Sequence, residues 1–287
     1  MKGEKCYVHL LCVLSLTLTL ASCVKHPYYT DDEWEDGNGN VHLSFALPDD
    51  ATVDKLNVQL FDHTGAKVFD RVKTQTVDDS QFGRLSLNLD EGDYIVVAVA
   101  HSSVRSATIT SPQEVRFTAN AGEKLTDTFS HCSSFSIPAG SPTVIDRPLQ
   151  RVTAMVRFVF TDEEVPDNFA RLLIEYTGGS ANFNPSTLQG VTKSSQSESR
   201  VAVPEQVYEV YTFPYLSEQG KLKITLTPLA ADGSAIREPR VIDDVLVTRN
   251  RITTLTGTIF ADGDTHQEQS SFDFTVGDWD GEDRYEF

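Results

Sequence analysis

The chain has few residues that could form disulfides or bind polyanions. Only four of its 287 residues are cysteines, and 24 lysines and arginines stand against 42 aspartates and glutamates, which gives a formal charge of −18. An acidic chain without a basic run repels phosphate backbones, so we expect no nucleic-acid partner. Aromatic residues make up 9% and apolar residues 39% of the chain, which is lean but sufficient for β-rich cores and too high for a disordered protein.

Sequence signatures of catalysis are also absent. No G-x-S-x-G elbow, P-loop or G-x-G-x-x-G occurs, and none of the seven histidines stands at metal-ligand spacing. His131 and Cys132 are neighbours, but neighbouring residues in a strand point to opposite faces. We therefore expect Cys132 to be a small, buried residue rather than half of a Cys–His dyad, and we expect no enzymatic activity.

Two acidic segments are similar to calcium-binding loops without matching one. In the first, residues 31–39, Trp34 stands where the alternating oxygen ligands would require Asp or Asn. The second, Asp278–Asp283, is the densest carboxylate group, but Gly281 follows Asp280 directly, so the oxygen ligand expected between Asp280 and the glycine is missing. A solvated tether and a solvated tail are the simpler interpretations, so no metal or cofactor is expected.

The N-terminal segment has the pattern of a bacterial lipoprotein signal peptide. Two lysines precede an apolar stretch of about 14 residues, which ends in the small residues and cysteine of Leu20–Cys23. This stretch is shorter than the ~20 residues that span a bilayer as a helix, so we expect residues 1–22 to be cleaved off. The alternative is an ordinary secretory signal whose cleavage site happens to contain cysteine.

Cys23 is then expected to be the first mature residue and to carry the lipid on its sulfur. Cleavage would remove two lysines and one glutamate, so the formal charge would become −19, and Cys132 would have no cysteine partner for a disulfide. Stable attachment requires more than one acyl chain, palmitate among them. Residues 23–40 are acidic and are expected to form a solvated tether. These features predict an extracytoplasmic protein held by lipid at the outer membrane.

After residue 40 the chain alternates apolar and polar residues with a period of two. Val41–Leu47 and Leu56–Phe61 are clear examples, and turns recur about every 8–15 residues without convincing helical periodicity. The run Tyr94–Ala100 is continuously apolar, as expected of a central strand covered on both faces. The pattern predicts an all-β chain of antiparallel sandwiches.

The best candidate for a domain boundary is the Pro/Gly/Ser-rich stretch Pro138–Pro142. It predicts an N-terminal domain over residues 41–140 and a C-terminal domain over residues 141–287 with an acidic tail. A second series of strands follows this boundary. The polar stretch between Gly178 and Pro204 is expected to be a long exposed loop.

This arrangement resembles the FimB-like family of Bacteroidales fimbrial lipoproteins, the minor and anchor subunits of type V pili. The resemblance rests on the lipobox cysteine and tether, followed in the family's order by Leu56–Gly65, Leu89–Ala98, Leu149–Val159 and Asp243–Gly257. It implies two transthyretin-like Greek-key β-sandwich domains in tandem. It also implies a non-catalytic subunit that anchors or terminates a pilus at the outer membrane, although divergent members include tip and accessory subunits.

By the same resemblance, the expected partners are fimbrial stalk or accessory subunits joined by β-strand addition. One candidate segment is the first-domain edge around Val41–Leu47, and the other is the terminal run in which Phe272, Phe274 and Val276 share a face. The acidic loop over residues 261–271 is long enough to let that run swing out. The run is equally well interpreted as the permanent last strand of its own domain.

A surface glycan-binding lipoprotein is the second hypothesis. Tyr208, Tyr211, Phe213 and Tyr215 lie within eight residues, and aromatic faces stack on sugar rings. Packing in the core is the simpler role for the same side chains. Exposure distinguishes the two, because a glycan module needs coplanar rings that face solvent.

Overall fold

The computed structural model describes residues 39–104, 107–118, 123–216, 220–260 and 273–279. Within these ranges the chain folds into strands β1 to β20 and contains no α-helix, so the all-β prediction is confirmed. The same residues include no helix that is long and apolar enough to cross a membrane. The expected signal peptide, Cys23 and nearly all of the tether lie outside the described residues.

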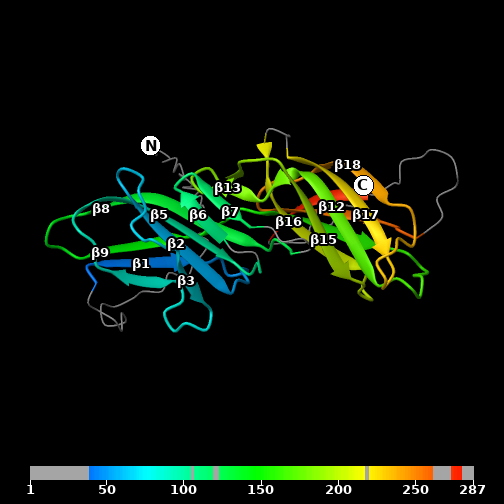
Figure 1. The fold of residues 1–287 in the computed structure, drawn as a ribbon, viewed down its shortest axis with the longest axis horizontal. Helices are drawn as coiled ribbons and strands as arrows, with labels where there is room; N and C mark the ends of the chain where they lie inside the picture. The colour runs from blue at the N-terminus through cyan, green and yellow to red at the C-terminus, as the bar shows by residue number, and fades with distance from the viewer. Residues whose placement is uncertain (1–38, 105–106, 119–122, 217–219, 261–272, 280–287) are drawn as a thin grey trace, which may run out of the picture.

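The N-terminal half is a sandwich of two sheets (Figure 1). The smaller sheet has the order β4 (Arg84–Leu87), β1 (Val41–Ala46), β9 (Thr143–Pro148). The larger has the order β10 (Gln150–Arg151), β8 (Thr128–Ile137), β5 (Gly92–His101), β2 (Lys55–Asp62), β3 (Lys73–Thr76). Alternate apolar residues of both sheets, including Leu43, Leu60 and Phe129, form the core between them.

The C-terminal half is a second sandwich with four strands in each layer. One layer has the order β18 (Arg240–Leu246), β17 (Lys221–Leu229), β12 (Arg171–Ser180), β15 (Ser194–Val201). The other has the order β16 (Val207–Pro214), β11 (Ala154–Phe160), β19 (Arg251–Gly257), β20 (Asp273–Asp278). The layers join where the end of β12 pairs with β16. Gly178 has a φ of +105° at the bulge before this junction, where a Cβ would collide with the backbone of Lys221.

The two sandwiches repeat one seven-strand arrangement. In the first, β1 lies between antiparallel β4 and parallel β9, and the facing sheet contains the order β8-β5-β2-β3. In the second, β11 lies between antiparallel β16 and parallel β19, and the facing order is β18-β17-β12-β15. Corresponding strands follow the same order along the chain, so each half is a Greek-key sandwich. β20 has no counterpart among the described strands of the first half.

Two inserted hairpins form a sheet that the halves share. β6 (Ala107–Ser111) and β7 (Glu114–Phe117) follow β5, whereas β13 (Asn182–Asn184) and β14 (Gln189–Gly190) follow β12. Pairing of β7 with β13 joins them in the order β14-β13-β7-β6. A third core forms here, in which the Phe213 ring lies 5.7 Å from that of Phe117 and 4.7 Å from that of Phe183.

The continuous apolar run of β5 is covered on both faces, as its sequence predicts. Val96 and Ala98 pack in the core of the first sandwich, while Val97 and Val99 pack in the third core, which the two halves share. Burial on both sides therefore explains why this strand does not alternate.

The change from one sandwich to the other does not coincide with the Pro/Gly/Ser-rich stretch. Pro138–Pro142 is the loop between β8 and β9, and both β9 and β10 are hydrogen-bonded to strands of the first sandwich. The chain passes to the second sandwich between Arg151 and Ala154. Proline and glycine mark turns in general, so they do not distinguish a loop within one sandwich from a linker between two.

Two further expectations about single segments were wrong. The stretch between Gly178 and Pro204 is not a loop, because it contains β13, β14 and β15; β15 pairs along β12 and buries Gln196 and Glu198 in spite of its polar sequence. β1 is not an edge strand, because it has a partner on each side. The first error arises because a polar composition does not exclude strand pairing, and the second because β9, a partner of β1, is about a hundred residues away in the chain.

His101, at the end of β5, is buried as a neutral imidazole. Its exposed fraction is 1%, its Nδ1 accepts a hydrogen bond from the Ser103 N–H at 3.0 Å, and its Nε2 lies 2.9 Å from Asn57 Oδ1. Since Nδ1 is an acceptor, Nε2 carries the proton and donates to Asn57. Burial, assisted by the charge of Lys55, lowers the pKa of His101 to about 4.

We predict that this histidine weakens the fold in mild acid. The unfolded chain binds the proton near pH 6.5 and the folded chain only near pH 4, so the contribution of His101 is intact above pH 6.5 and is lost as the pH falls toward 4. The loss amounts to about 3 kcal/mol at most. Urea denaturation at pH 7 and pH 4 should show a smaller decrease in stability for His101→Gln than for the wild type. His63→Gln, at an exposed turn, should keep the wild-type decrease, and equal decreases for all three proteins would refute the assignment.

Candidate functional site

The terminal strand β20 is an edge strand added to the second sandwich. It pairs antiparallel with β19, so that Phe274 stands opposite Leu255 and Val276 opposite Thr253. Among the described strands it has no other partner, and it lies outside the seven-strand repeat. Phe272, the remaining residue of the predicted strand-exchange set, lies outside the described residues. β20 therefore extends a sandwich that already has all seven strands of the repeat.

Trp279, directly after β20, ties the end of the strand to the junction between the sandwiches. Its ring lies 4.0 Å from the guanidinium carbon of Arg151 and 6.1 Å from the ring of Tyr211. The same guanidinium lies 4.7 Å from the ring of Phe129 in β8. Arg151 thus makes cation–π contacts with a ring from each half of the chain.

Arg151 also makes charged hydrogen bonds to both halves. Its Nε donates to the carboxylate of Asp127 at 2.9 and 3.0 Å, and its Nη2 donates to Asp50 at 2.5 Å. Its Nη1 donates to Asn250 Oδ1 at 3.0 Å, just before β19. The Arg151 side chain is 5% exposed. Burial raises the pKa of Asp127, and the charge of Arg151 opposes that rise.

A cleft of about 640 Å³ opens beside this cluster, between the two sandwiches. Lys124 and Thr126 line it from the first half, and Arg200, Tyr211 and Trp279 line it from the second. Arg200 is not available to a ligand, because it pairs with the buried Glu198 and donates to the carbonyl of Glu209 at 3.0 Å. Several polar groups beside the cleft are thus engaged with one another, which suits a structural junction.

The aromatic cluster near Tyr208 packs in the cores. Tyr208 is 4% exposed and belongs to the core of the second sandwich, while Phe213 is fully buried in the third core. Tyr211 is partly buried, and burial raises the pKa of its hydroxyl. These three rings therefore do not form a coplanar, solvent-facing platform.

The other sequence candidates make structural contacts. His131 Nε2 lies 2.8 Å from Ser133 Oγ, whereas Cys132 Sγ lies 3.3 Å from Ser186 Oγ and packs against the third core. Burial raises the pKa of the Cys132 thiol, which disfavours the reactive thiolate. Of the carboxylates in the acidic segment Asp278–Asp283, only that of Asp278 belongs to a described residue. Those residues contain no group of three or more His, Cys, Asp or Glu placed to hold a metal ion.

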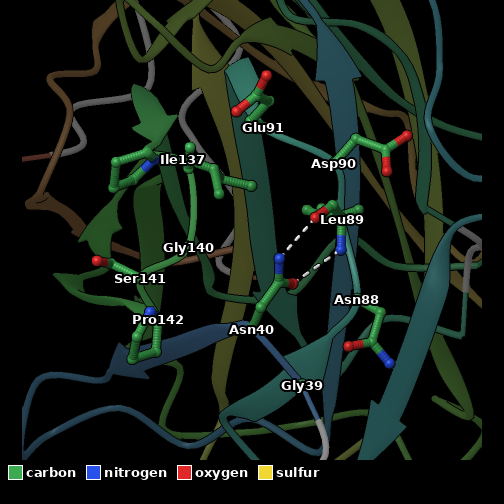
Figure 2. Close-up of a pocket in the computed structure, with 12 residues that line it drawn as sticks. Gly39, Asn40, Asn88, Leu89, Asp90, Glu91, Ile137, Gly140, Ser141 and Pro142 are labelled. Atoms are coloured by element: carbon green, nitrogen blue, oxygen red, sulfur yellow. Dashed lines mark hydrogen bonds between the residues drawn. The ribbon is translucent and has the colours of Figure 1, made fainter.

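A second hollow, of about 560 Å³, lies at the end of the first sandwich where β1 begins (Figure 2). We call it the free-end hollow, since β1 runs from it toward the junction. The Asn40 side chain donates to the carbonyl of Leu89 at 2.6 Å and accepts from its N–H at 2.9 Å, which fixes the loop after β4. Pro138–Pro142 form the opposite wall. Asp90 and Glu91 are among the lining residues, none of which is basic.

We predict that removal of the Arg151 side chain destabilises the junction. Arg151→Ala would leave Asp127 buried without its counter-charge, which should lower the free energy of unfolding by about 3–5 kcal/mol. Arg157→Ala is the matched control, because Arg157 pairs with Glu209 in a partly exposed bridge that should contribute less than about 1 kcal/mol. Urea denaturation of both variants tests this, and equal losses would contradict the role of Arg151.

No protein-family model and no curated protein matches the chain. Solved structures do match it, at low sequence identity. A Bacteroides thetaiotaomicron protein, provisionally described as polysaccharide-binding, has 12% identity and a TM-score of 0.51 and covers 76% of this chain and 91% of its own. A Bacteroides ovatus protein, provisionally described as an adhesin, has 15% identity and a TM-score of 0.50 and covers 70% and 82%.

The fimbrial anchor protein Mfa2 from Porphyromonas gingivalis also aligns, with 15% identity over 83% of this chain and 97% of its own. Its TM-score of 0.45 is too low to establish a common fold alone. The structural neighbours thus include proteins described as adhesins and a fimbrial anchor protein. At these identities, the Bacteroides matches show that the chain shares their β-sandwich fold.

Proposed function

We propose that this protein is a lipid-anchored structural subunit of a fimbria, which anchors or terminates the polymer at the outer membrane without catalysis. The observation that carries the proposal is β20, an edge strand appended to a complete seven-strand sandwich. An edge strand offers a row of backbone donors and acceptors to another chain. Strand addition between subunits uses such a surface, whereas an enzyme would need a cluster of reactive groups.

Strand addition supplies both the strength and the specificity of such a joint. Backbone hydrogen bonds bind any extended segment, and alternate side chains select the partner. In this proposal Phe272, Phe274 and Val276 are the selecting residues, and the partner is a fimbrial stalk or accessory subunit. Release of β20 from β19 would also separate Trp279 from Arg151 and Tyr211, so the contacts at the junction oppose premature release.

The proposed anchor and the proposed joint lie at different ends of the chain. Residues 23–38 connect Cys23 to Gly39, which lines the free-end hollow. Fully extended, a segment of this length would reach about 50 Å. The first sandwich would then be tethered by its free end, with the second sandwich and β20 farther along the chain.

We predict that Cys23→Ala prevents membrane attachment, because it removes the sulfur that carries the lipid. The variant should appear in the soluble fraction or remain unprocessed when cells are fractionated. Cys132→Ala is the matched control and should stay with the membrane. Tight membrane attachment of Cys23→Ala would reject the lipid anchor.

Truncation tests the terminal strand. A chain that ends at Ala261 lacks β20 but keeps all seven repeat strands, so it should fold and fail to co-purify with the fimbrial polymer. A chain that ends at Trp279 keeps β20 and should retain the polymer. If the shorter chain unfolds, β20 belongs permanently to the core. If it still carries the polymer, strand addition through this segment is wrong.

A glycan-binding lipoprotein is the second candidate function. It is favoured by Tyr211 and Trp279, whose rings both line the cleft between the sandwiches. However, Tyr211 is partly buried and one face of Trp279 lies against Arg151, so the ring surface left for a sugar is reduced. The fimbrial role therefore accounts better for the structure.

A further inference from the structure

Each sandwich has a seam, where two strands that follow one another in the chain lie in different sheets. β3 is the last strand of the larger N-terminal sheet, and β4 is the first of the smaller one. β15 and β16 repeat this arrangement, because β15 pairs along β12 while β16 pairs along β11. We call these places the β3–β4 seam and the β15–β16 seam. Within the described residues, neither seam is bridged by pairing between its own two strands.

The carbonyl of Arg84 points into the β3–β4 seam. The Phe45 N–H donates to the carbonyl of Gly83 at 2.8 Å, so that carbonyl faces β1, and alternation turns the next one, of Arg84, the other way. The Gln75 side chain of β3 crosses the seam, where its Nε2 donates to the carbonyls of Arg84 and Gln81 at 2.6 and 2.9 Å. Its Oε1 accepts from the Gly83 N–H at 3.0 Å. One side-chain amide thus takes the place of strand pairing at the start of β4.

The β15–β16 seam is closed in the same manner. The Phe160 N–H donates to the carbonyl of Gln206 at 3.0 Å, so this carbonyl faces β11. By alternation, the carbonyls of Glu209 and Tyr211 face away from β11 and into the seam. Arg200 of β15 reaches across it, and its Nη2 donates to the Glu209 carbonyl at 3.0 Å.

A buried carboxylate holds the groups that cover β16. Glu198 is fully buried and pairs with Arg200, and its Oε1 lies 2.9 Å from the hydroxyl oxygen of Tyr176. That hydroxyl lies 3.0 Å from the carbonyl oxygen of Tyr211. A buried polar network whose members are hydrogen-bonded keeps its side chains in fixed positions. Two successive outward carbonyls of β16 therefore each have a side chain against them.

Gln75 and Arg200 occupy the same position in the internal repeat. Gln75 stands opposite Leu56, the second residue of β2, and Arg200 stands opposite Leu172, the second residue of β12. In both halves the strand across the seam follows a residue with positive φ, +88° at one site and +52° at the other. The two side chains differ in length and charge, yet each crosses its seam to a backbone carbonyl. The closure is therefore a feature of both sandwiches.

We propose that Gln75 and Arg200 close the seams and so prevent the backbone of β4 and β16 from pairing with a second copy of this chain. An edge with unpaired backbone groups recruits extended segments of other chains. Arg200 and Glu209 line the cleft between the sandwiches, so the β15–β16 seam is within reach of such a segment. The inference goes beyond the proposed function, because it concerns edges other than β20 and is tested without a polymer.

Gln75→Leu tests the first seam. Gln75 is only half-buried, so the purified full-length variant should fold but lack the amide that covers β4. Sedimentation equilibrium should show at least tenfold tighter self-association than for the wild type. Gln113→Leu makes the same change at an exposed turn and should associate as the wild type does. Circular dichroism and thermal unfolding check that both variants are folded.

The double variant Glu198→Leu with Arg200→Met tests the second seam. It removes both buried charges together while filling their volume, a replacement that proteins often tolerate. It should also self-associate at least tenfold more tightly than the wild type. Arg171→Met is the matched control, because Arg171 donates to Ser199 Oγ at 2.8 Å on the solvent side of β15 and does not cross the seam.

A proline shows whether association occurs through the seam. The N–H of Ser86, two residues after Arg84, points into the seam by the same alternation. Ser86→Pro in the Gln75→Leu background removes this donor and should restore wild-type association. Unchanged self-association of the folded Gln75→Leu variant would overturn the inference, and so would an increase that Ser86→Pro does not reverse. If the double variant unfolds, the Gln75 series decides alone.

Discussion

The pairing of β7 with β13 sets the arrangement of the whole molecule. These strands belong to hairpins inserted in different halves of the chain, and their hydrogen bonds join the halves into one sheet. The sheet covers the second face of the large N-terminal sheet and encloses Phe117, Phe183 and Phe213 in a common core. Such a core resists movement between the halves because separating them would expose these rings to water. The end-to-end arrangement in Figure 1 is a consequence of this contact.

Arg151 adds specificity to that apolar contact. A buried ion pair gains little net stability, since the cost of removing both charges from water is large. Its hydrogen bonds are directional, however, and Asp50, Asp127 and Asn250 must all be correctly placed to satisfy one guanidinium. The apolar core holds the halves together, and Arg151 selects one orientation. Trp279 on the same guanidinium couples this orientation to the end of β20.

Because the two sandwiches repeat one strand arrangement, each end of the first sandwich has a counterpart in the second. The end of the second sandwich that docks on the first corresponds to the end of the first sandwich that carries the free-end hollow. One is covered by Trp279 and by residues of the neighbouring sandwich, while the other is lined by Asn40, Asp90 and Pro138–Pro142.

The sequence alone determined the character of most segments. Alternation identified most strands, the continuous run in β5 indicated burial on two faces, and adjacency in a strand separated His131 from Cys132. Leu20–Cys23 predicts the lipid anchor from local chemistry, and no tertiary contact is needed for that argument. Phe274 and Val276 likewise have the alternation of a strand. These properties are local, because the order of apolar and polar residues within a segment reflects which of its own side chains are buried.

Only the tertiary structure decided which strands are partners. β1 has the pattern of any half-buried strand, yet it is central because β9 returns to it about a hundred residues later. β15 has the polar composition of a loop, but pairing with β12 makes it a strand. The role of Arg151 at the junction could not be predicted from the sequence, because its partners Asp50 and Asn250 are each about a hundred residues away in the chain. Every strand offers the same backbone hydrogen-bonding groups, so these groups do not specify its partner. The partner is specified by which apolar faces are buried together in the folded chain.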